Sequence, residues 1–361
     1  MSEYTTSVLA WIQRPVLIKY DLGEPKSVKT HLERDRRRLN FLLFFMTDPT
    51  AYRGLRPKLS KRFYKAHGLG NDYLVFERFE DDEGYWVATP KNVSIVCDPH
   101  RGLGSDGIVA LLSERSVKSP TQLSVSLRMF NPDGSEFERS GNGLRVLAAH
   151  LSTREPQLDV IDAEVGGERV RIHIHGMREG IFDASVEMGS ARLGPVAIGA
   201  ESDLLRGDSA PYTLIGPGGE LLEVVPVSIG NPHVVILAGS EEQSFCEDRL
   251  SALGPFISAH PSILAGANVQ LARVLDGRAQ AYIWERGVGS TSASGTSSCA
   301  VAVALVATGL LPPGEVLVDM PGGRLTVLIG DSLAVTLRGP VTSVMSGMLE
   351  EGLLATFEHG S

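Results

Sequence analysis

The chain alternates apolar and polar positions in short runs that glycine-rich turns separate, a pattern typical of β-strands joined by tight connections. A strand, a turn and a second strand are predicted over 62–77, and the same plan is predicted over 94–112. Residues 123–140 alternate up to an Asn-Pro-Asp-Gly turn at 131–134, which favours a hairpin. Strict alternation over 169–176 predicts a further strand.

The second part of the chain follows the same pattern. A strand, a turn and a strand are predicted over 223–238, and hairpins are predicted over 268–286 and 324–339. In each part of the chain a long apolar run begins directly after a Ser-Gly pair, at Ser140 and at Ser294. These runs predict two helices that are apolar on nearly all sides, so each helix is expected to be buried within its own sheet.

The repeated order of elements indicates an internal duplication, with a ligand held between the two halves. We expect an α/β (α+β) fold of two pseudo-symmetric halves. The first half takes residues 61–184 plus 338–361, and the second half takes residues 185–337. Residues 1–60 show no sustained period. They are interpreted as an N-terminal extension, either disordered or the product of a wrongly chosen start, with Met46 as the true one.

The composition is that of a soluble globular protein, with 43% apolar and 21% charged residues. The net charge of −9 argues against nucleic acid as a partner, because a basic surface is its usual sign. The three cysteines form neither a disulfide framework nor a metal-binding spacing, which favours a reducing, cytoplasmic location. The early apolar run Leu39–Met46 is too short to span a bilayer, so we expect no membrane association.

Ser140 and Ser294 each precede a predicted helix, and two interpretations of them are open. Serine is among the best N-cap residues, so each side chain could serve only its own helix. Alternatively, two helix starts that face one cleft could bracket an anionic ligand, because their first N–H groups lack partners and their dipoles favour negative charge. The equivalent positions in the two halves strengthen the second interpretation.

Four asparagines lie in or beside turns, where a side-chain amide usually serves its own backbone. Because an amide both donates and accepts hydrogen bonds, the same side chains could bind carboxylate and ammonium groups. They are Asn71, Asn131, Asn231 and Asn268.

Charged and titratable residues flank these turns. Glu285 and Arg286 precede the second glycine-rich turn; they could form a surface ion pair of little energetic worth, or hold the ammonium and carboxylate of an amino acid. His67 and His233 flank two of the asparagine-containing turns. We interpret both as hydrogen-bonded structural histidines in preference to catalytic bases.

Six segments of the chain resemble, in the same order, motifs of the diaminopimelate epimerase family: HGLGNDYLVFE, GLGSDG, FNPDGSEFERSGNGLR, GNPHVVI, ANVQ and WERGVGSTSASGTSSCAVAVAL. The resemblance covers about residues 61–350. It implies two halves, each a barrel-like, mostly antiparallel sheet around a central helix, with the active site in the cleft between them. It also implies an epimerase that needs no cofactor or metal and interconverts LL- and meso-diaminopimelate for lysine and peptidoglycan precursor synthesis. A small amino-acid substrate is the partner expected, and a homodimer is left open.

The resemblance also assigns site residues position by position. The substrate-binding positions that it implies are Asn71, Asn131, Asn231, Asn268, Glu285 and Arg286, with the backbone of Gly141, Asn142, Gly295 and Thr296. Thr296 stands where serine is common in the family, and Gly107 stands where some members use glutamine.

The chain departs from the family at the two proton-transfer positions, where Ser140 and Ser294 replace cysteines. A thiol has a pKa of about 8.5, which a helix N-terminus can lower, whereas serine is not among the side chains that ionise in the accessible range. A helix dipole contributes about 1 kcal/mol, and one pKa unit corresponds to about 1.4 kcal/mol. Dipoles alone therefore do not make these alcohols into bases. Cys299 matches the family's second, non-catalytic cysteine and is predicted to point into the packing.

Three functions stay open on the sequence. The first is an amino-acid epimerase whose wild-type activity is absent or very slow. The second is a dehydratase or isomerase that uses another base in the same cleft, with His67 or His233 as the candidate. The third is a binding protein or regulator that keeps the ligand cleft without the catalytic thiols.

Overall fold

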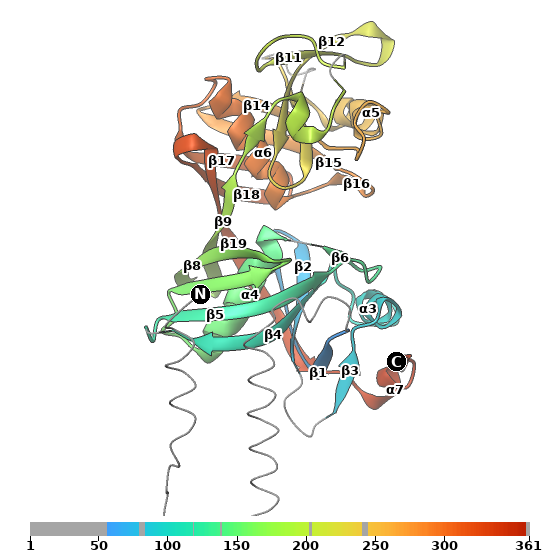
Figure 1. Ribbon diagram of the computed structural model, residues 1–361, viewed down its shortest axis with the longest axis vertical. Helices are drawn as coiled ribbons and strands as arrows, with labels where there is room; N and C mark the ends of the chain where they lie inside the picture. The colour runs from blue at the N-terminus through green and yellow to red at the C-terminus, as the bar shows by residue number, and fades with distance from the viewer. Residues whose placement is uncertain are drawn as a thin grey trace, which may run out of the picture. The chain divides into compact units, whose positions relative to one another are not determined.

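A computed structural model describes residues 56–78, 84–117, 119–137, 139–201, 204–239 and 245–358 (Figure 1). The chain divides into two compact units, Met1–Leu55 and Arg56–Ser361, and everything below concerns the second. The N-terminal extension that the sequence predicts, with the apolar run Leu39–Met46, lies outside the described residues apart from its last few positions. The boundaries predicted between the two halves stay a prediction.

Eight strands of the first half close into a barrel around one helix, α4 (Gly141–Arg154). Neighbouring strands pair around the ring as β1–β2–β4–β5–β7–β8–β9–β19 and back to β1. Their bounds are β1 Lys58–Gly68, β2 Asn71–Arg78, β4 Ile108–Ser116, β5 Gln122–Phe130, β7 Val160–Val165, β8 Glu168–Arg178, β9 Ile181–Ser190 and β19 Ala334–Met348. Two pairs, β2–β4 and β5–β7, are parallel, and the others are antiparallel.

The second half surrounds α6 (Gly295–Ala307) with strands paired in the same order. The sheet runs β10–β12–β13–β14–β15–β17–β18–β19, with β13–β14 and β15–β17 parallel. The bounds are β10 Arg192–Leu193, β12 Leu221–Ser228, β13 Pro232–Leu237, β14 Asn268–Leu275, β15 Arg278–Glu285, β17 Gly314–Met320 and β18 Gly323–Ile329. An antiparallel pair, a parallel step, a hairpin and a second parallel step therefore occur once in each half, as a duplication predicts.

Shorter elements complete the described part of the chain. They are β3 Tyr85–Val87, α3 Pro90–Cys97, β6 Glu136–Phe137, β11 Tyr212–Ile215, α5 Glu247–Ser258, β16 Gly289–Thr291 and α7 Glu351–Leu354, with 3₁₀ turns at Pro195–Ile198, Pro217–Gly219 and Asp331–Leu333. Helix α3 stands between β2 and β4 as α5 stands between β13 and β14, which extends the repeat.

The two central helices are buried, as their apolar sequences predict. All residues of 141–149 in α4 and of 297–305 in α6 are buried. Helix α6 ends at Thr308, and Gly309 follows with a φ of 73°, a left-handed conformation that glycine adopts at low cost. Gly309 therefore marks the end of α6.

Strand β19 belongs to both halves. Its first residues pair with β18, from Val335 opposite Ile329 to Arg338 opposite Thr326. Its last residues pair with β1, from Thr342 opposite His67 onward. The strand therefore carries the second half's sheet directly into the first half's barrel, and its middle lies where the two meet.

The prediction of strand, turn and strand over 94–112 is wrong for its first element. Residues Pro90–Cys97 form a helix because Thr89 caps it, accepting a hydrogen bond from the Asn92 N–H at 3.2 Å, and because Pro90 occupies the first helical position. Only the second element, Ile108–Ser116, is a strand.

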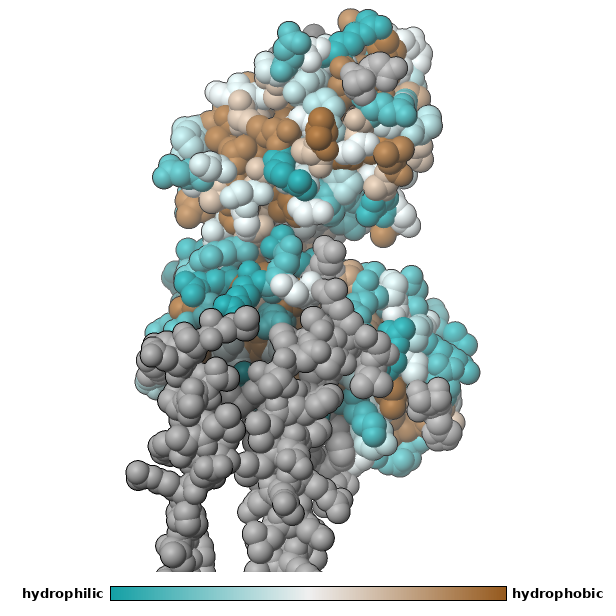
Figure 2. Space-filling model, in the orientation of Figure 1, coloured by the Kyte–Doolittle hydropathy of each residue, from teal (hydrophilic) through white to brown (hydrophobic). Residues whose placement is uncertain are grey.

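The surface mixes polar and apolar residues. Figure 2 shows apolar side chains scattered among polar ones on the face in view, and the most exposed large apolar residues, Val196, Leu264 and Val288, lie on separate segments. None of the helices in the described ranges is long and apolar enough to cross a membrane.

The hairpin turn before β6 gives a test of the fold. Gly134 has a φ of 80°, and a methyl group added there would lie 2.2 Å from Pro90 Cα. Gly180, in the turn between β8 and β9, has nearly the same φ of 79° and no heavy atom within 4 Å of an added methyl. We expect Gly180→Ala to cost about 1 kcal/mol of stability, the penalty of a left-handed alanine. Gly134→Ala should cost about 1–3 kcal/mol more, because it also overpacks the turn.

Urea unfolding of both variants measures this difference. Equal losses of stability in Gly134→Ala and Gly180→Ala would contradict the packing of this turn against α3.

Candidate active site

The starts of α4 and α6 meet at Leu337, in the middle of β19. A methyl group added at Gly141 or at Gly295 would lie 2.9 Å from the same atom, Leu337 Cδ2. The two added methyl groups would therefore be at most twice that distance apart. The first N–H groups of each helix lack intrahelical partners, and both helix dipoles place their positive ends here. The two starts together therefore form one concentrated site for negative charge.

Ser140 caps its own helix. Its Oγ accepts a hydrogen bond from the Gly143 N–H at 3.1 Å. The same hydroxyl is hydrogen-bonded to the phenol of Tyr73, a buried residue of β2. Burial raises the pKa of Tyr73 to about 12, and the hydrogen bond to Ser140 opposes that rise. Tyr73 is therefore a neutral phenol beside the first serine.

Ser294 does not use its side chain as a cap, so the cap interpretation is wrong for this serine. Its hydroxyl is hydrogen-bonded instead to the carboxylate of Glu285, at the end of β15. Burial raises the pKa of Glu285, the hydrogen bond from Ser294 lowers it, and the negative charge of Asp106 raises it further. The two serines, equivalent in the repeat, thus have different partners: a phenol on one side and a carboxylate on the other.

Asn71 and Asn142 lie together at the start of α4. Asn142 Nδ2 donates to the Asn71 backbone oxygen at 2.6 Å and to Asn71 Oδ1 at 2.8 Å. Asn71 Nδ2 in turn donates to Asp106 Oδ2 at 2.8 Å. Two of the predicted binding residues are thus joined by direct contact.

Asn131 lies in its own turn. Its Nδ2 donates to Ser135 Oγ at 2.9 Å, and its backbone N–H donates to the Ser135 carbonyl. This arrangement matches the local, turn-stabilising interpretation of the residue.

The predicted residues of the second half gather around the start of β14. Asn268 Oδ1 accepts from the Arg286 backbone N–H at 2.9 Å, and Asn268 Nδ2 donates to the Pro232 carbonyl at 3.3 Å. The Arg286 guanidinium donates to the carbonyl of Ala265. Asn231 Oδ1 lies 2.8 Å from His233 Nε2.

His233 is a structural histidine. It is fully buried, its Nδ1 lies 3.0 Å from Gln270 Nε2, and its other ring nitrogen faces Asn231. Burial lowers the pKa of His233 to about 3, so the ring is neutral. His67 accepts a hydrogen bond at Nδ1 from the Gly70 N–H at 3.2 Å. Both observations agree with the structural interpretation of these histidines, and neither supports His233 as a base.

Two further expectations concern space and packing. Cys299 is fully buried, and burial raises the pKa of its thiol to about 12, so it points into the packing as predicted. A side chain at Gly107 would meet the Tyr73 ring at 2.7 Å and the Phe130 carbonyl at 2.9 Å. The tyrosine ring therefore fills the space beside that position.

Sequence reasoning missed three residues of this site: Tyr73, Asp106 and Arg145. Tyr73 and Asp106 stand in the motifs HGLGNDYLVFE and GLGSDG. Arg145 had a visible signal, since it is the one charged residue between Ser140 and His150. No group of three or more histidine, cysteine or acidic residues suited to a metal occurs in the part of the chain that the structure describes.

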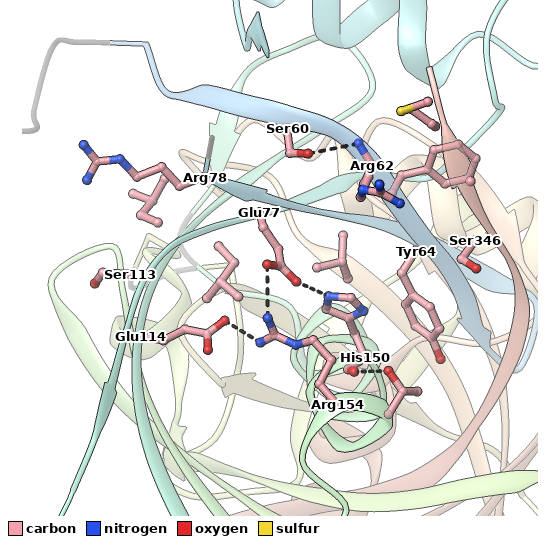
Figure 3. Close-up of a pocket in the computed structure, with 17 residues that line it drawn as sticks. Ser60, Arg62, Tyr64, Glu77, Arg78, Ser113, Glu114, His150, Arg154 and Ser346 are labelled. Atoms are coloured by element: carbon pink, nitrogen blue, oxygen red, sulfur yellow. Dashed lines mark hydrogen bonds and ion pairs between the residues drawn. The ribbon is translucent and has the colours of Figure 1, made fainter. Parts of the chain in front are cut away.

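A cavity of about 910 Å³ lies at the other end of α4 (Figure 3). Four of its charged side chains pair with one another: Arg154 lies 3.1 Å from Glu77 and 2.5 Å from Glu114, and His150 lies 2.7 Å from Glu77. The dipole of α4 places its negative end here, whereas its positive end lies at the helix start.

Comparison with known proteins identifies the family. The family model described as diaminopimelate epimerase matches residues 63–194 and 225–344. A diaminopimelate epimerase from Pseudomonas syringae pv. tomato is 34% identical over 293 residues, which cover 80% of this chain and 98% of that protein. One from Desulforudis audaxviator is 35% identical over 297 residues, with 79% and 98% covered. The chain belongs to the diaminopimelate epimerase family.

A solved structure supports the fold of this family member. A predicted epimerase from Pseudomonas aeruginosa has a TM-score of 0.53 and 19% identity, with 80% of this chain and 99% of that one covered. At this identity the likeness shows the α+β fold alone. The sequence matches place the chain among enzymes of the isomerase and epimerase kind.

The half-buried carboxylate of Glu285 predicts a pH-dependent stability. Because its pKa is raised on folding, the folded protein holds this proton more tightly than the unfolded chain does, and stability falls as pH rises between the unfolded and folded pKa. Glu285→Gln removes that loss. We expect the melting temperature of Glu285→Gln minus that of the wild type to increase from pH 4 to pH 8.

Glu77→Gln is the opposite control. The hydrogen bond from His150 lowers the pKa of Glu77, so this carboxylate stabilises the fold above its unfolded pKa and loses that effect as pH falls. Thermal unfolding followed by circular dichroism should therefore show Glu77→Gln less stable than wild type at pH 8. If Glu285→Gln behaves like Glu77→Gln at pH 8, the assigned environment of Glu285 is wrong.

Proposed function

We propose that this member of the diaminopimelate epimerase family binds diaminopimelate between the starts of α4 and α6 and interconverts its LL and meso forms slowly. The observation that carries the proposal is the convergence of the two helix starts on Leu337, with Ser140 and Ser294 at their N-caps. An amino acid bound there has one serine hydroxyl from each half beside it.

The binding roles follow from the chemistry of the groups present. The α-carboxylate of the ligand accepts from the backbone N–H groups at Gly141–Asn142 and Gly295–Thr296, where the helix dipoles favour negative charge. The ammonium group is held by Glu285, whose carboxylate is half-buried beside Ser294. Hydrogen bonds in such a site are charge-assisted, which makes them stronger than those between neutral groups.

Slow turnover follows from the two serines. Epimerisation removes the α-proton on one face of the carbon and returns a proton on the other, so each face needs a group that exchanges protons near neutral pH. Ser140 is hydrogen-bonded to a phenol whose pKa is raised to about 12, which makes that side a poor base. On the other side, Glu285 accepts a hydrogen bond from Ser294. In the complex its negative charge also pairs with the ligand ammonium, so this carboxylate is not free to act as the base.

Proton exchange measured in D2O tests this function. With purified protein and LL-diaminopimelate, we expect the ligand's NMR lines to broaden and its α-proton signal to decay slowly. The double variant Ser140→Cys with Ser294→Cys should accelerate the decay by about 100-fold or more, the usual contribution of a positioned general base.

Ser152→Cys is the matched control, because it makes the same change in the last turns of α4, far from the helix start. It should leave the exchange rate unchanged. Line broadening with no exchange in the double variant would contradict the catalytic part of the proposal and leave a ligand-binding homologue. No broadening in any variant would contradict the binding part as well.

A further inference from the structure

We propose that Arg145 is a positioning residue, which fixes the direction of a hydrogen-bond relay from Arg145 through Asn142 and Asn71 to Asp106. The inference rests on the proposed function for its ligand, but the relay itself is a property of the free protein. It assigns a role to a buried cation of α4 that the binding residues described above do not use.

Arg145 is buried to an unusual degree for a charged residue. Its side chain is 1% exposed, and it is the largest of the fully buried side chains. Nη2 donates to Asn142 Oδ1 at 3.1 Å, while Nε and Nη1 have no hydrogen-bond partner among the described residues. Burial lowers the pKa of Arg145 to about 10, so the guanidinium stays charged at neutral pH.

The backbone makes room for this guanidinium with two glycines. A methyl group at Gly68, the last residue of β1, would lie 2.0 Å from Asn142 Oδ1 and 3.0 Å from Arg145 Nη2. One at Gly339, on β19, would lie 3.4 Å from Arg145 Cζ. The contact between Arg145 and Asn142 therefore occupies a space that β1 leaves open because Gly68 lacks a side chain, while Gly339 on β19 lies at van der Waals distance from the guanidinium.

The chemistry of guanidinium sets the direction of the relay. Arginine donates hydrogen bonds and accepts none, so the Asn142 amide must turn its oxygen toward Arg145 and its Nδ2 toward Asn71. Asn71 Oδ1 is then the acceptor, at 2.8 Å, and its Nδ2 must face Asp106. Each step leaves one orientation for the next amide.

Without Arg145 the orientation of the two amides rests only on the acceptors at the other end of the relay, the Asn71 carbonyl and the Asp106 carboxylate. An asparagine amide has nearly the same shape in its two orientations, and only its partners decide between them. If the Asn142 amide turns over, its oxygen faces Asn71 Oδ1, and Asn71 must turn as well. Asp106 would then face an oxygen in place of a donor. Arg145 thus adds to the constraint on which atoms Asn71, a predicted binding residue, presents to a ligand.

Stability and binding should respond to Arg145 in different directions. Replacing a buried, incompletely paired charge by an apolar side chain of similar size is often neutral or stabilising. Arg145→Met should therefore melt at or above the wild-type temperature, although it binds ligand more weakly. A residue that serves only packing would lower stability and leave the affinity of the folded protein unchanged.

The first measurement needs no ligand. The side-chain amide signals of Asn71 and Asn142 in ¹⁵N-labelled full-length protein, assigned with Asn71→Asp and Asn142→Asp, should shift or broaden in Arg145→Met. In Arg154→Met, which makes the same change at the other end of α4, they should stay in place. Unchanged amide signals in Arg145→Met would overturn the relay, whatever the ligand is.

The second measurement titrates LL-diaminopimelate into the same proteins by calorimetry. The dissociation constant should rise about tenfold in Arg145→Met, the loss expected when one buried polar contact is misdirected. Arg145→Lys keeps a donor for Asn142, so its dissociation constant should lie between those of the wild type and Arg145→Met. The dissociation constant of Arg154→Met should match that of the wild type. Shifted amide signals with unchanged affinity would overturn the role in binding. Absence of binding by the wild type would instead count against the proposed function, and the amide signals would still decide the relay.

Discussion

The close approach of two helix N-termini is the constraint on which the rest of this structure depends. A methyl group added at Gly141 or at Gly295 would lie 2.9 Å from Leu337 Cδ2, so a side chain at either position would force Leu337 to move. Two positive helix ends repel one another, and the buried guanidinium of Arg145 adds a further positive charge one turn into α4. A site of this kind favours an anionic ligand. The carboxylates of Glu285 and Asp106 lie near it, but they are side chains of the protein and do not replace a bound anion.

The duplication explains how the chain builds such a site, and the serines show where the two halves diverge. Each half wraps strands of the same order around one helix, and β19 joins the two sheets so that both helix starts meet at its middle. Yet Ser140 caps its helix beside a phenol, whereas Ser294 leaves its helix uncapped and is hydrogen-bonded to a carboxylate. The pseudo-symmetry of the backbone therefore does not extend to proton chemistry.

Much of this could be predicted from the sequence, because local signals decide it. The helices after Ser140 and Ser294, the hairpins near 131–134 and 276–277 and the end of α6 at Gly309 follow from periodicity, turn residues and glycine. The error at 94–97 also has a local cause, since Thr89 and Pro90 start a helix whose short apolar run looks like a strand.

What the sequence could not give depends on contacts between distant segments. Tyr73 meets Ser140 only because the barrel closes around α4, and Glu285 reaches Ser294 only through the hairpin geometry of β15 and β16. The partner of each serine therefore had no signal in its own motif. The same holds for Arg145, because the space for its contact with Asn142 depends on Gly68, far away in the chain.

A crystal structure of the protein with meso-diaminopimelate tests the central claim most directly. The account predicts one ligand carboxylate about 3 Å from the backbone nitrogens at the starts of both α4 and α6, with Ser140 and Ser294 on opposite faces of the α-carbon. A ligand bound elsewhere, for example in the cavity beside His150 and Arg154, with the two helix starts filled only by water, would contradict it.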